Sequence, residues 1–102
     1  TAQLRTFVER MKAYHRGETI DRNGTASKLR WLDSVDVAPV PIDIACTGPR
    51  TIEMAIDVAD RVSFAVGSAP ERIEWALGVA RARLAATGRA RDSVRIGAYV
   101  NL

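Results

Sequence analysis

The chain has 102 residues, a formal net charge of +3, 47% apolar and 26% charged residues, which fits one globular domain. No apolar run is long enough to span a membrane and no signal peptide is present, so we expect a cytoplasmic protein with no membrane partner. The charges are spread without aromatic interleaving, which argues against a nucleic-acid partner. The single cysteine excludes an internal disulfide.

Residues 1–17 are predicted to form a helix and its stop. Four apolar residues recur at helical spacing and define one stripe: Leu4, Phe7, Val8 and Met11. Gly17 follows the basic last turn and is typical of a helix end.

Residues 18–38 are predicted to form a hairpin-like insertion. The expected elements are a short strand at 19–21, a tight turn at Asn23-Gly24, a returning strand at 29–32 and an extended linker at 33–38.

Residues 39–102 alternate between strand and helix patterns and predict a βαβαβ unit. The expected strands are 42–46, 62–66 and 94–100 or beyond, and the expected helices are 49–60 and 69–87. Crossover helices of this length imply parallel pairing, which is used by doubly wound sheets and by (β/α)₈ barrels. A barrel needs about 250 residues, so this chain would supply somewhat under half of one.

The second helix of this unit carries start and stop signals. Ser68 with Glu71 three residues later forms the pattern of a capping box. Gly88 is expected to end the same helix.

The junction between the first strand and helix of the unit has the chemistry of an anion site. Proline at the first helical position has no N–H to leave unpaired, and Gly48 before it allows a sharp turn and close approach of a ligand. The N–H groups of Gly48, Arg50 and Thr51 would point outward at the positive end of the helix dipole. Such a site suits a phosphate, although any strand-to-helix connection also needs a turn of this kind.

Other chemistry finds little support in these residues. His15 is the only histidine and has no ligand partner at a metal-binding spacing. Cys46 lies in an apolar run, where free cysteine is usually a small buried hydrophobe and not a nucleophile. The glycine spacings of the P-loop and of the dinucleotide fold are both absent after Gly48.

Two aspartates invite a structural explanation. Asp43 lies in an otherwise apolar strand, where pairing with an arginine is expected ahead of a catalytic role. Asp60 closes the preceding helix, where pairing with Arg61 or with a turn amide would account for it.

Three stretches carry a resemblance to a known family: 41–55 (PIDIACTGPRTIEMA), 59–62 (ADRV) and 66–73 (VGSAPERI). With them the chain resembles the luciferase-like monooxygenase superfamily. It is most similar to the branch of methylene-tetrahydromethanopterin reductases and other oxidoreductases that depend on the deazaflavin coenzyme F-420. Residues 17–19, Gly24 and 29–32 also resemble the insertion that the family places before this strand, so the resemblance covers nearly the whole chain.

The resemblance implies a TIM-barrel enzyme that moves hydride between coenzyme F-420, or alternatively FMN, and a small organic substrate. It implies that Thr47, Gly48, Arg50 and Thr51 help to bind the cofactor phosphate, and that the full-length protein is a homo-oligomer. Gly67 and Ser68 would face the same barrel mouth. No catalytic residue can be assigned, because the family's substrate contacts come largely from other strands and loops.

The sequence also departs from the family pattern and leaves rival functions open. Asp60-Arg61 stands where the family usually has Asp-Gly, and Cys46 stands where a small alanine is more usual. The rivals are an FMN-dependent monooxygenase that consumes oxygen and a small α/β binding module without catalysis. Because both ends look cut, we expect a piece of a barrel that is inactive and self-associating when isolated.

Overall fold

The computed structural model describes residues 1–36 and 38–101, which form two compact units. One unit comprises Ala2–Val40 and the other begins at Pro41. The sequence predicts that the βαβαβ unit starts at residue 39, and Val37 of the predicted linker lies outside the described residues. No helix in the described part of the chain is long and apolar enough to cross a membrane.

The first unit opens with α1 (Ala2–His15), as predicted. The helix ends at Gly17, whose φ of 79° is left-handed and whose N–H donates to the Tyr14 carbonyl at 2.9 Å. Val8 of the predicted apolar stripe is buried, whereas Leu4 and Phe7 are 39% and 59% exposed.

The hairpin is shorter than the sequence predicts. Strands β1 (Ile20–Arg22) and β2 (Thr25–Ser27) pair antiparallel around Asn23 and Gly24, which both have positive φ, as a tight two-residue turn requires. The prediction of a returning strand at 29–32 is wrong. A two-residue turn places Thr25 opposite Arg22, so the returning strand begins directly after the turn and ends before these residues.

A short 3-10 helix, Arg30–Ser34, occupies the place of the predicted returning strand. The Ser34 hydroxyl donates to the Trp31 carbonyl at 2.7 Å and closes this turn locally. Local side-chain bonds of this kind compete with strand pairing.

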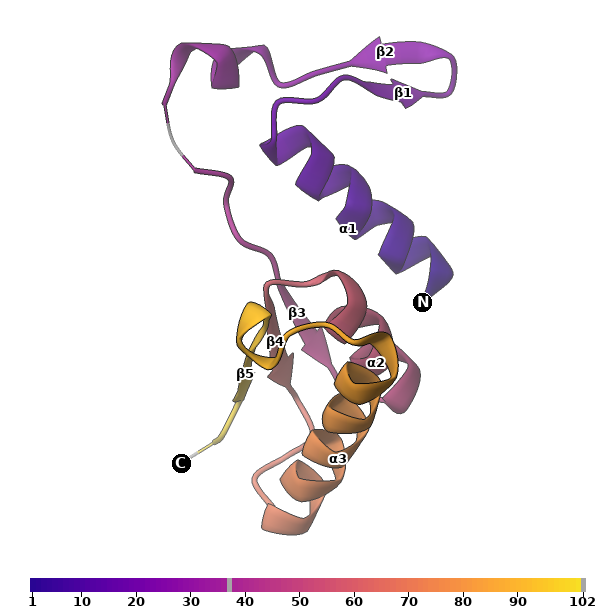
Figure 1. Ribbon diagram of the computed structural model, residues 1–102, viewed down its shortest axis with the longest axis vertical. Helices are drawn as coiled ribbons and strands as arrows, with labels where there is room; N and C mark the ends of the chain where they lie inside the picture. Colours follow the sequence, from indigo (N-terminus) through magenta and orange to yellow (C-terminus); the bar gives the residue numbers. More distant parts are fainter. Residues whose placement is uncertain (37, 102) are drawn as a thin grey trace. The chain divides into compact units, whose positions relative to one another are not determined.

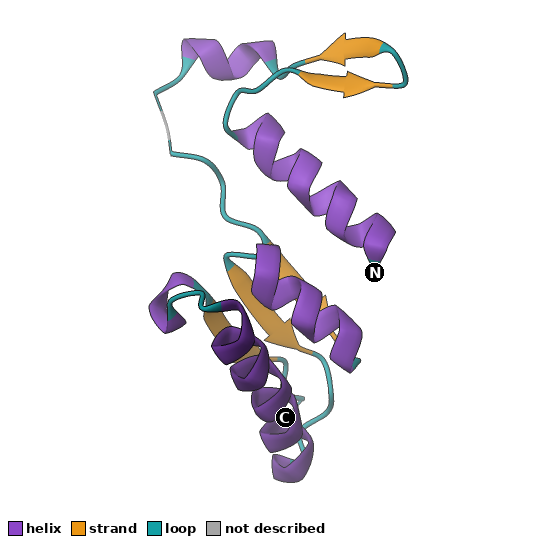
Figure 2. Ribbon diagram, turned by 45° about the vertical axis from the view of Figure 1, so that its right-hand side comes forward, coloured by secondary structure: helices purple, strands orange, loops and turns teal. Residues whose placement is uncertain are grey.

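The second unit is the predicted βαβαβ unit. Its elements in chain order are β3 (Asp43–Cys46), α2 (Pro49–Val58), β4 (Arg61–Phe64), α3 (Pro70–Thr87) and β5 (Arg95–Ala98). The strands are parallel in the order β3-β4-β5. Both helices pack on one face of this sheet and against each other (Figures 1 and 2).

The core of this unit lies between the helices and the sheet. Alternate strand residues point toward the helices because successive side chains of a strand point to opposite faces. The buried residues of this layer include Ile44, Cys46, Val62 and Phe64 from the strands, Ile52, Ala55 and Ile56 from α2, and Ala76, Ala80 and Leu84 from α3. The opposite sheet face carries the exposed side chains of Asp43, Ala45 and Arg61.

The predicted capping box at the start of α3 is wrong. Pro70 occupies the first helical position, so Ala69 is the N-cap residue and no side chain caps the helix. Ser68 lies one residue too early to act as the N-cap. At the other end Gly88, with φ of 70°, ends the helix as predicted.

Candidate anion-binding site

The junction between β3 and α2 has the backbone geometry that its sequence predicts. The first helical hydrogen bond runs from the Ile52 N–H to the Gly48 carbonyl at 3.0 Å. The N–H groups of Gly48, Arg50 and Thr51 precede this bond and have no acceptor within the helix, and Pro49 contributes no N–H. Three donors therefore lie at the positive end of the α2 dipole.

The backbone conformation at position 48 does not require glycine. Its φ of −117° and ψ of 164° are extended values that any residue adopts, so the expectation that it permits a sharp turn is wrong. A Cβ built on Gly48 would meet no atom within 4 Å. The absence of a side chain therefore leaves open the volume directly beside the free N–H groups.

The four predicted site residues lie close together because they fall within the short stretch from Thr47 to Thr51, with Pro49 between Gly48 and Arg50. Thr47 and Arg50 are exposed, whereas Gly48 and Thr51 are half-buried. No partner for the Arg50 guanidinium is found among the residues that the structure describes, so its charge is available to an anion. The cluster thus combines backbone donors, a hydroxyl group and a cation.

A second loop lies at the same end of the sheet. Because β3 and β4 are parallel, Thr47-Gly48 and Gly67-Ser68 follow neighbouring strand ends. The Ala65 N–H donates to the Cys46 carbonyl at 2.8 Å and continues the pairing to the point where both loops begin. Gly67 of this second loop has a left-handed φ of 89°, and Ser68 is exposed beside the first loop's end of the sheet.

Cys46 does not take part in this site as a nucleophile. Its side chain is fully buried, and its thiol lies 3.4 Å from the Ile44 carbonyl oxygen and 3.7 Å from the Thr51 carbonyl oxygen. Burial, and secondarily the negative charge of Asp43, raise the pKa of the Cys46 thiol to about 11. The prediction of a small buried hydrophobe is confirmed.

Asp43 pairs with an arginine, as the sequence predicts. The Arg61 Nε atom lies 3.6 Å from the Asp43 carboxylate, and the Ser63 hydroxyl donates to both carboxylate oxygens at 2.8 Å. Sequence reasoning missed Ser63, whose side chain is buried. The parallel register, which sets Asp43 opposite Arg61 and Ala45 opposite Ser63, brings these residues together.

Gly97 of β5 completes this cluster on the open sheet face. A Cβ on Gly97 would lie 2.9 Å from the Arg61 Nη2 atom, so the arginine side chain crosses the sheet over the glycine. This polar cluster explains Asp43 without a catalytic role.

No group of three or more potential metal ligands occurs among the residues that the structure describes. His15 lies at the end of α1 and its Nδ1 donates to the Val40 carbonyl at 3.2 Å.

Comparison with known protein families identifies the chain. The model of the luciferase-like monooxygenase family matches residues 1–102. A comparison with curated proteins finds none that matches. Since the family match spans all of the sequence, the chain belongs to the luciferase-like monooxygenase family.

Proposed function

We propose that this chain is part of an oxidoreductase that transfers hydride between coenzyme F-420 and a small organic substrate. Membership of the luciferase-like family supports a flavin-type cofactor and oxidoreductase or monooxygenase chemistry. The preference for F-420 rests on the resemblance to the F-420-dependent branch. The alternative is an FMN-dependent monooxygenase that uses oxygen.

The observation that carries this proposal is the start of α2. Three backbone N–H groups without helical acceptors lie next to a position that Gly48 leaves without a side chain, and the exposed Arg50 belongs to the same helical turn. Backbone donors at a helix N-terminus, together with an arginine fork, suit a phosphate oxygen. These residues fit the phosphate that both F-420 and FMN carry, so the site supports either cofactor.

The resemblance to the luciferase-like family supports a barrel in preference to a doubly wound sheet, and the strand order is compatible with a barrel. Right-handed crossovers between strands in the order β3-β4-β5 place both helices on the same face. A barrel keeps all its helices on the outside in this way, and each βαβαβ half of a doubly wound sheet also has its helices on one face, so the preference for the barrel rests on the family. In a barrel the Thr47-Gly48 and Gly67-Ser68 loops lie at the C-terminal mouth, where barrel enzymes place their active sites.

The residues of this chain have a binding role in this proposal. When bound, the cofactor supplies the hydride chemistry. Thr47, Gly48, Arg50 and Thr51 hold its phosphate and thereby fix the position of the cofactor at the mouth. No residue of the chain is assigned as a catalytic acid or base.

Titration of the full-length protein with each cofactor tests this function. We expect coenzyme F-420 to bind more tightly than FMN, as followed by the absorbance and fluorescence of each ring system. Tighter binding of FMN, with oxygen consumption in the presence of a reductant, would favour the monooxygenase. Failure of a folded protein to bind either cofactor would favour the non-catalytic binding module.

A substitution at Gly48 tests the site itself. Gly48→Val places a branched side chain in the volume where the phosphate approaches, and we expect the cofactor Kd to rise by about tenfold or more, equivalent to about 1.4 kcal/mol. Gly78→Val is the matched control, because Gly78 also has open space around its Cβ position but lies within α3. Equal affinity in the Gly48→Val protein and the wild type would contradict the phosphate site.

A further inference from the structure

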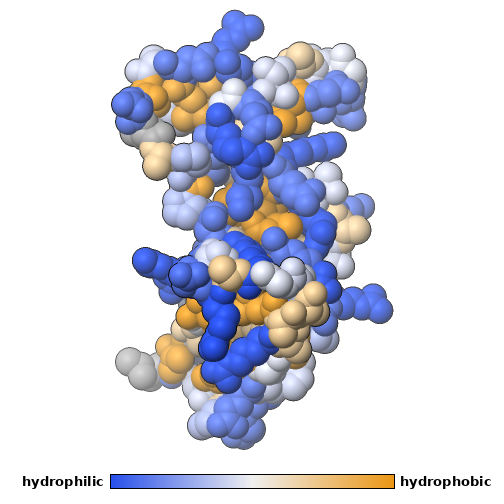
Figure 3. Space-filling view, in the orientation of Figure 1, coloured by the Kyte–Doolittle hydropathy of each residue, from blue (hydrophilic) through white to orange (hydrophobic). Residues whose placement is uncertain are grey.

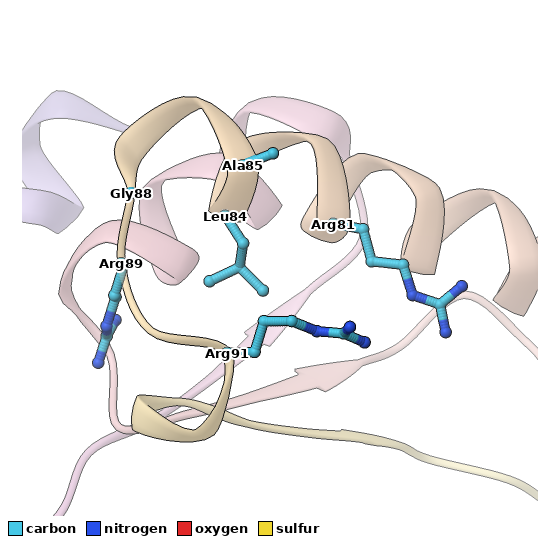
Figure 4. A pocket seen from close by; sticks show the side chains of 6 residues that line it. All are labelled: Arg81, Leu84, Ala85, Gly88, Arg89 and Arg91. Carbon is cyan, nitrogen blue, oxygen red and sulfur yellow. The ribbon is translucent and has the colours of Figure 1, made fainter.

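A cavity lies at the other end of the sheet from the Thr47-Gly48 loop. It has a volume of about 390 Å³ and is lined by the end of α3 and the segment that leads to β5 (Figure 4). The lining residues are Arg81, Leu84, Ala85, Gly88, Arg89 and Arg91. Because α3 runs back to the start of β5, this cavity lies near the N-terminal ends of the parallel strands.

One of the three arginines that line the cavity is fixed by hydrogen bonds within the protein. The Arg89 guanidinium donates to the Ile56 carbonyl at 2.5 Å, to the Ser93 hydroxyl at 2.9 Å and to the Ser93 carbonyl at 3.1 Å. In Figure 4 its side chain points away from the other two arginines. Arg89 therefore fixes the wall of the cavity and has little capacity left for a ligand.

The other two arginines have no acceptor among the described residues. On a helix surface Arg81 could pair with residues three or four positions away, but these are Leu77, Gly78, Leu84 and Ala85, none of which carries a charge. Arg83, by contrast, is paired through two hydrogen bonds to Asp57. In Figure 4 the guanidinium groups of Arg81 and Arg91 extend in the same direction past Leu84.

The floor of the cavity is apolar. Leu84 points from α3 into the space beside Arg91, is only 6% exposed, and is flanked by Ala85 (Figure 4). Two cations over an apolar floor suit a ligand with a negative head and a hydrocarbon body.

The helix end does not cancel this positive charge, because it carries only about half an elementary negative charge against the two positive charges of Arg81 and Arg91. The Leu84 carbonyl near this end also accepts a hydrogen bond from the Gly88 N–H at 3.1 Å. Asp92, next to Arg91, is the nearest carboxylate in sequence. Adjacent residues do not face each other across a helical turn, so Asp92 is poorly placed to neutralise Arg91.

We propose that this cavity binds a phosphomonoester carried on a short apolar group. The two guanidinium groups match the two charges of a phosphomonoester, and their planar forks suit its oxygens. The apolar group would lie on Leu84 and Ala85. The site is separate from the cofactor loop and does not depend on the function proposed for that loop.

Calorimetric titration of the full-length protein with phenyl phosphate tests this proposal. Phenyl phosphate is expected to bind at least about tenfold more tightly than inorganic phosphate, which lacks the apolar body, and than benzoate, which carries a single charge. Equal affinities for phenyl phosphate and inorganic phosphate would overturn the proposal, because the apolar floor would then contribute nothing.

Substitutions of single arginines test whether phenyl phosphate binds in this cavity. We expect Arg81→Gln and Arg91→Gln each to weaken phenyl phosphate binding by about tenfold, equivalent to about 1.4 kcal/mol. Arg22→Gln removes the same charge from the exposed hairpin and should leave the affinity unchanged. An equal loss in all three proteins, with wild-type circular dichroism spectra, would overturn the proposal by showing a general charge effect.

Discussion

The Cys46 thiol shows how its surroundings set the chemistry of a single residue. It lies on the helix-facing side of β3, without solvent exposure, in contact with backbone carbonyl oxygens. Removal from water disfavours the thiolate, and the Asp43 carboxylate disfavours it further. The residue that stands beside the candidate phosphate loop therefore contributes packing and not reactivity.

The raised pKa of Cys46 predicts a loss of stability in alkaline solution. Its pKa is about 11 in the fold against an ordinary value of 9.0, so between these values the unfolded chain releases the thiol proton while the folded chain retains it. The free energy of unfolding therefore falls as the pH rises through this window. Below the window the thiol is protonated in both states and lowers the stability by nothing.

Urea denaturation of the wild type and of Cys46→Ala measures this contribution. Between about pH 8 and about pH 10, the wild type should lose more stability than the variant, which has no thiol to titrate. Other groups titrate in both proteins and cancel in the comparison. Parallel losses would show that the thiol is not the source.

At the scale of elements, Asp60 joins the starts of all three strands of the parallel sheet. Its carboxylate accepts the Ile42 N–H at 2.8 Å, and its own N–H donates to the Ile42 carbonyl at 3.0 Å. Its carbonyl accepts the Arg95 N–H at 3.0 Å. One short connection between α2 and β4 thus fixes the positions of both neighbouring strands. The sequence predicts Arg61 or a turn amide as the partner of Asp60, whereas the carboxylate accepts from the N–H of the distant Ile42.

Replacement of Asp60 should loosen this end of the sheet. Asp60→Ala leaves the half-buried Ile42 N–H without its acceptor, and we expect a loss of about 1–2 kcal/mol in the free energy of unfolding. Asp60→Asn keeps an acceptor oxygen at the same position and should lose less. Equal stability of the alanine variant and the wild type in thermal melts would show that water replaces the carboxylate at no cost.

The elements themselves were predictable where local signals and the apolar pattern agree. Positive φ values end helices or form tight turns at Gly17, Gly88 and Asn23-Gly24. Because glycine and asparagine favour this conformation, their roles can be identified from sequence. The 3-10 helix at 30–34 and the N-cap at Ala69 could not be identified in this way. Their positions depend on a hairpin register and on which of two adjacent residues begins a helix.

The sites, too, include a part that the sequence predicts and a part that it does not. Thr47, Gly48, Arg50 and Thr51 fall within one short stretch that also contains Pro49, so their proximity follows from the sequence once the strand and helix are placed. The contact of Asp43 with Ser63 joins residues on two different strands. The cavity that includes Arg81 and Arg91 likewise joins α3 and the segment before β5. Both depend on packing and register, which the apolar pattern alone does not determine.

At the scale of the second unit, the sheet is protected on one face only. Both helices cover the same face, and β3 and β5 are the outer strands of the sheet. Tyr99 and Val100, directly after β5, are 58% and 51% exposed, and orange apolar surface lies open on this unit in Figure 3. Outer strands with unpaired N–H and carbonyl groups are templates for pairing with a second chain.

The 102-residue chain is therefore expected to self-associate when produced alone. Sedimentation velocity should show species larger than a monomer, in proportions that grow with concentration, because strand edges and apolar surface become covered by other copies. A chain that sediments as a monomer at all concentrations and unfolds cooperatively would contradict this expectation.

The passage of Arg61 over Gly97 has a consequence for how sequences of this family can vary. A Cβ at position 97 would lie 2.9 Å from the Arg61 Nη2 atom, so alanine at this position would require the end of the arginine side chain to move. Glycine at position 61 would leave that space free for a side chain at position 97. Where homologous sequences are aligned, we expect arginine at position 61 to occur together with glycine at position 97, because the arginine side chain extends from β4 over the neighbouring strands.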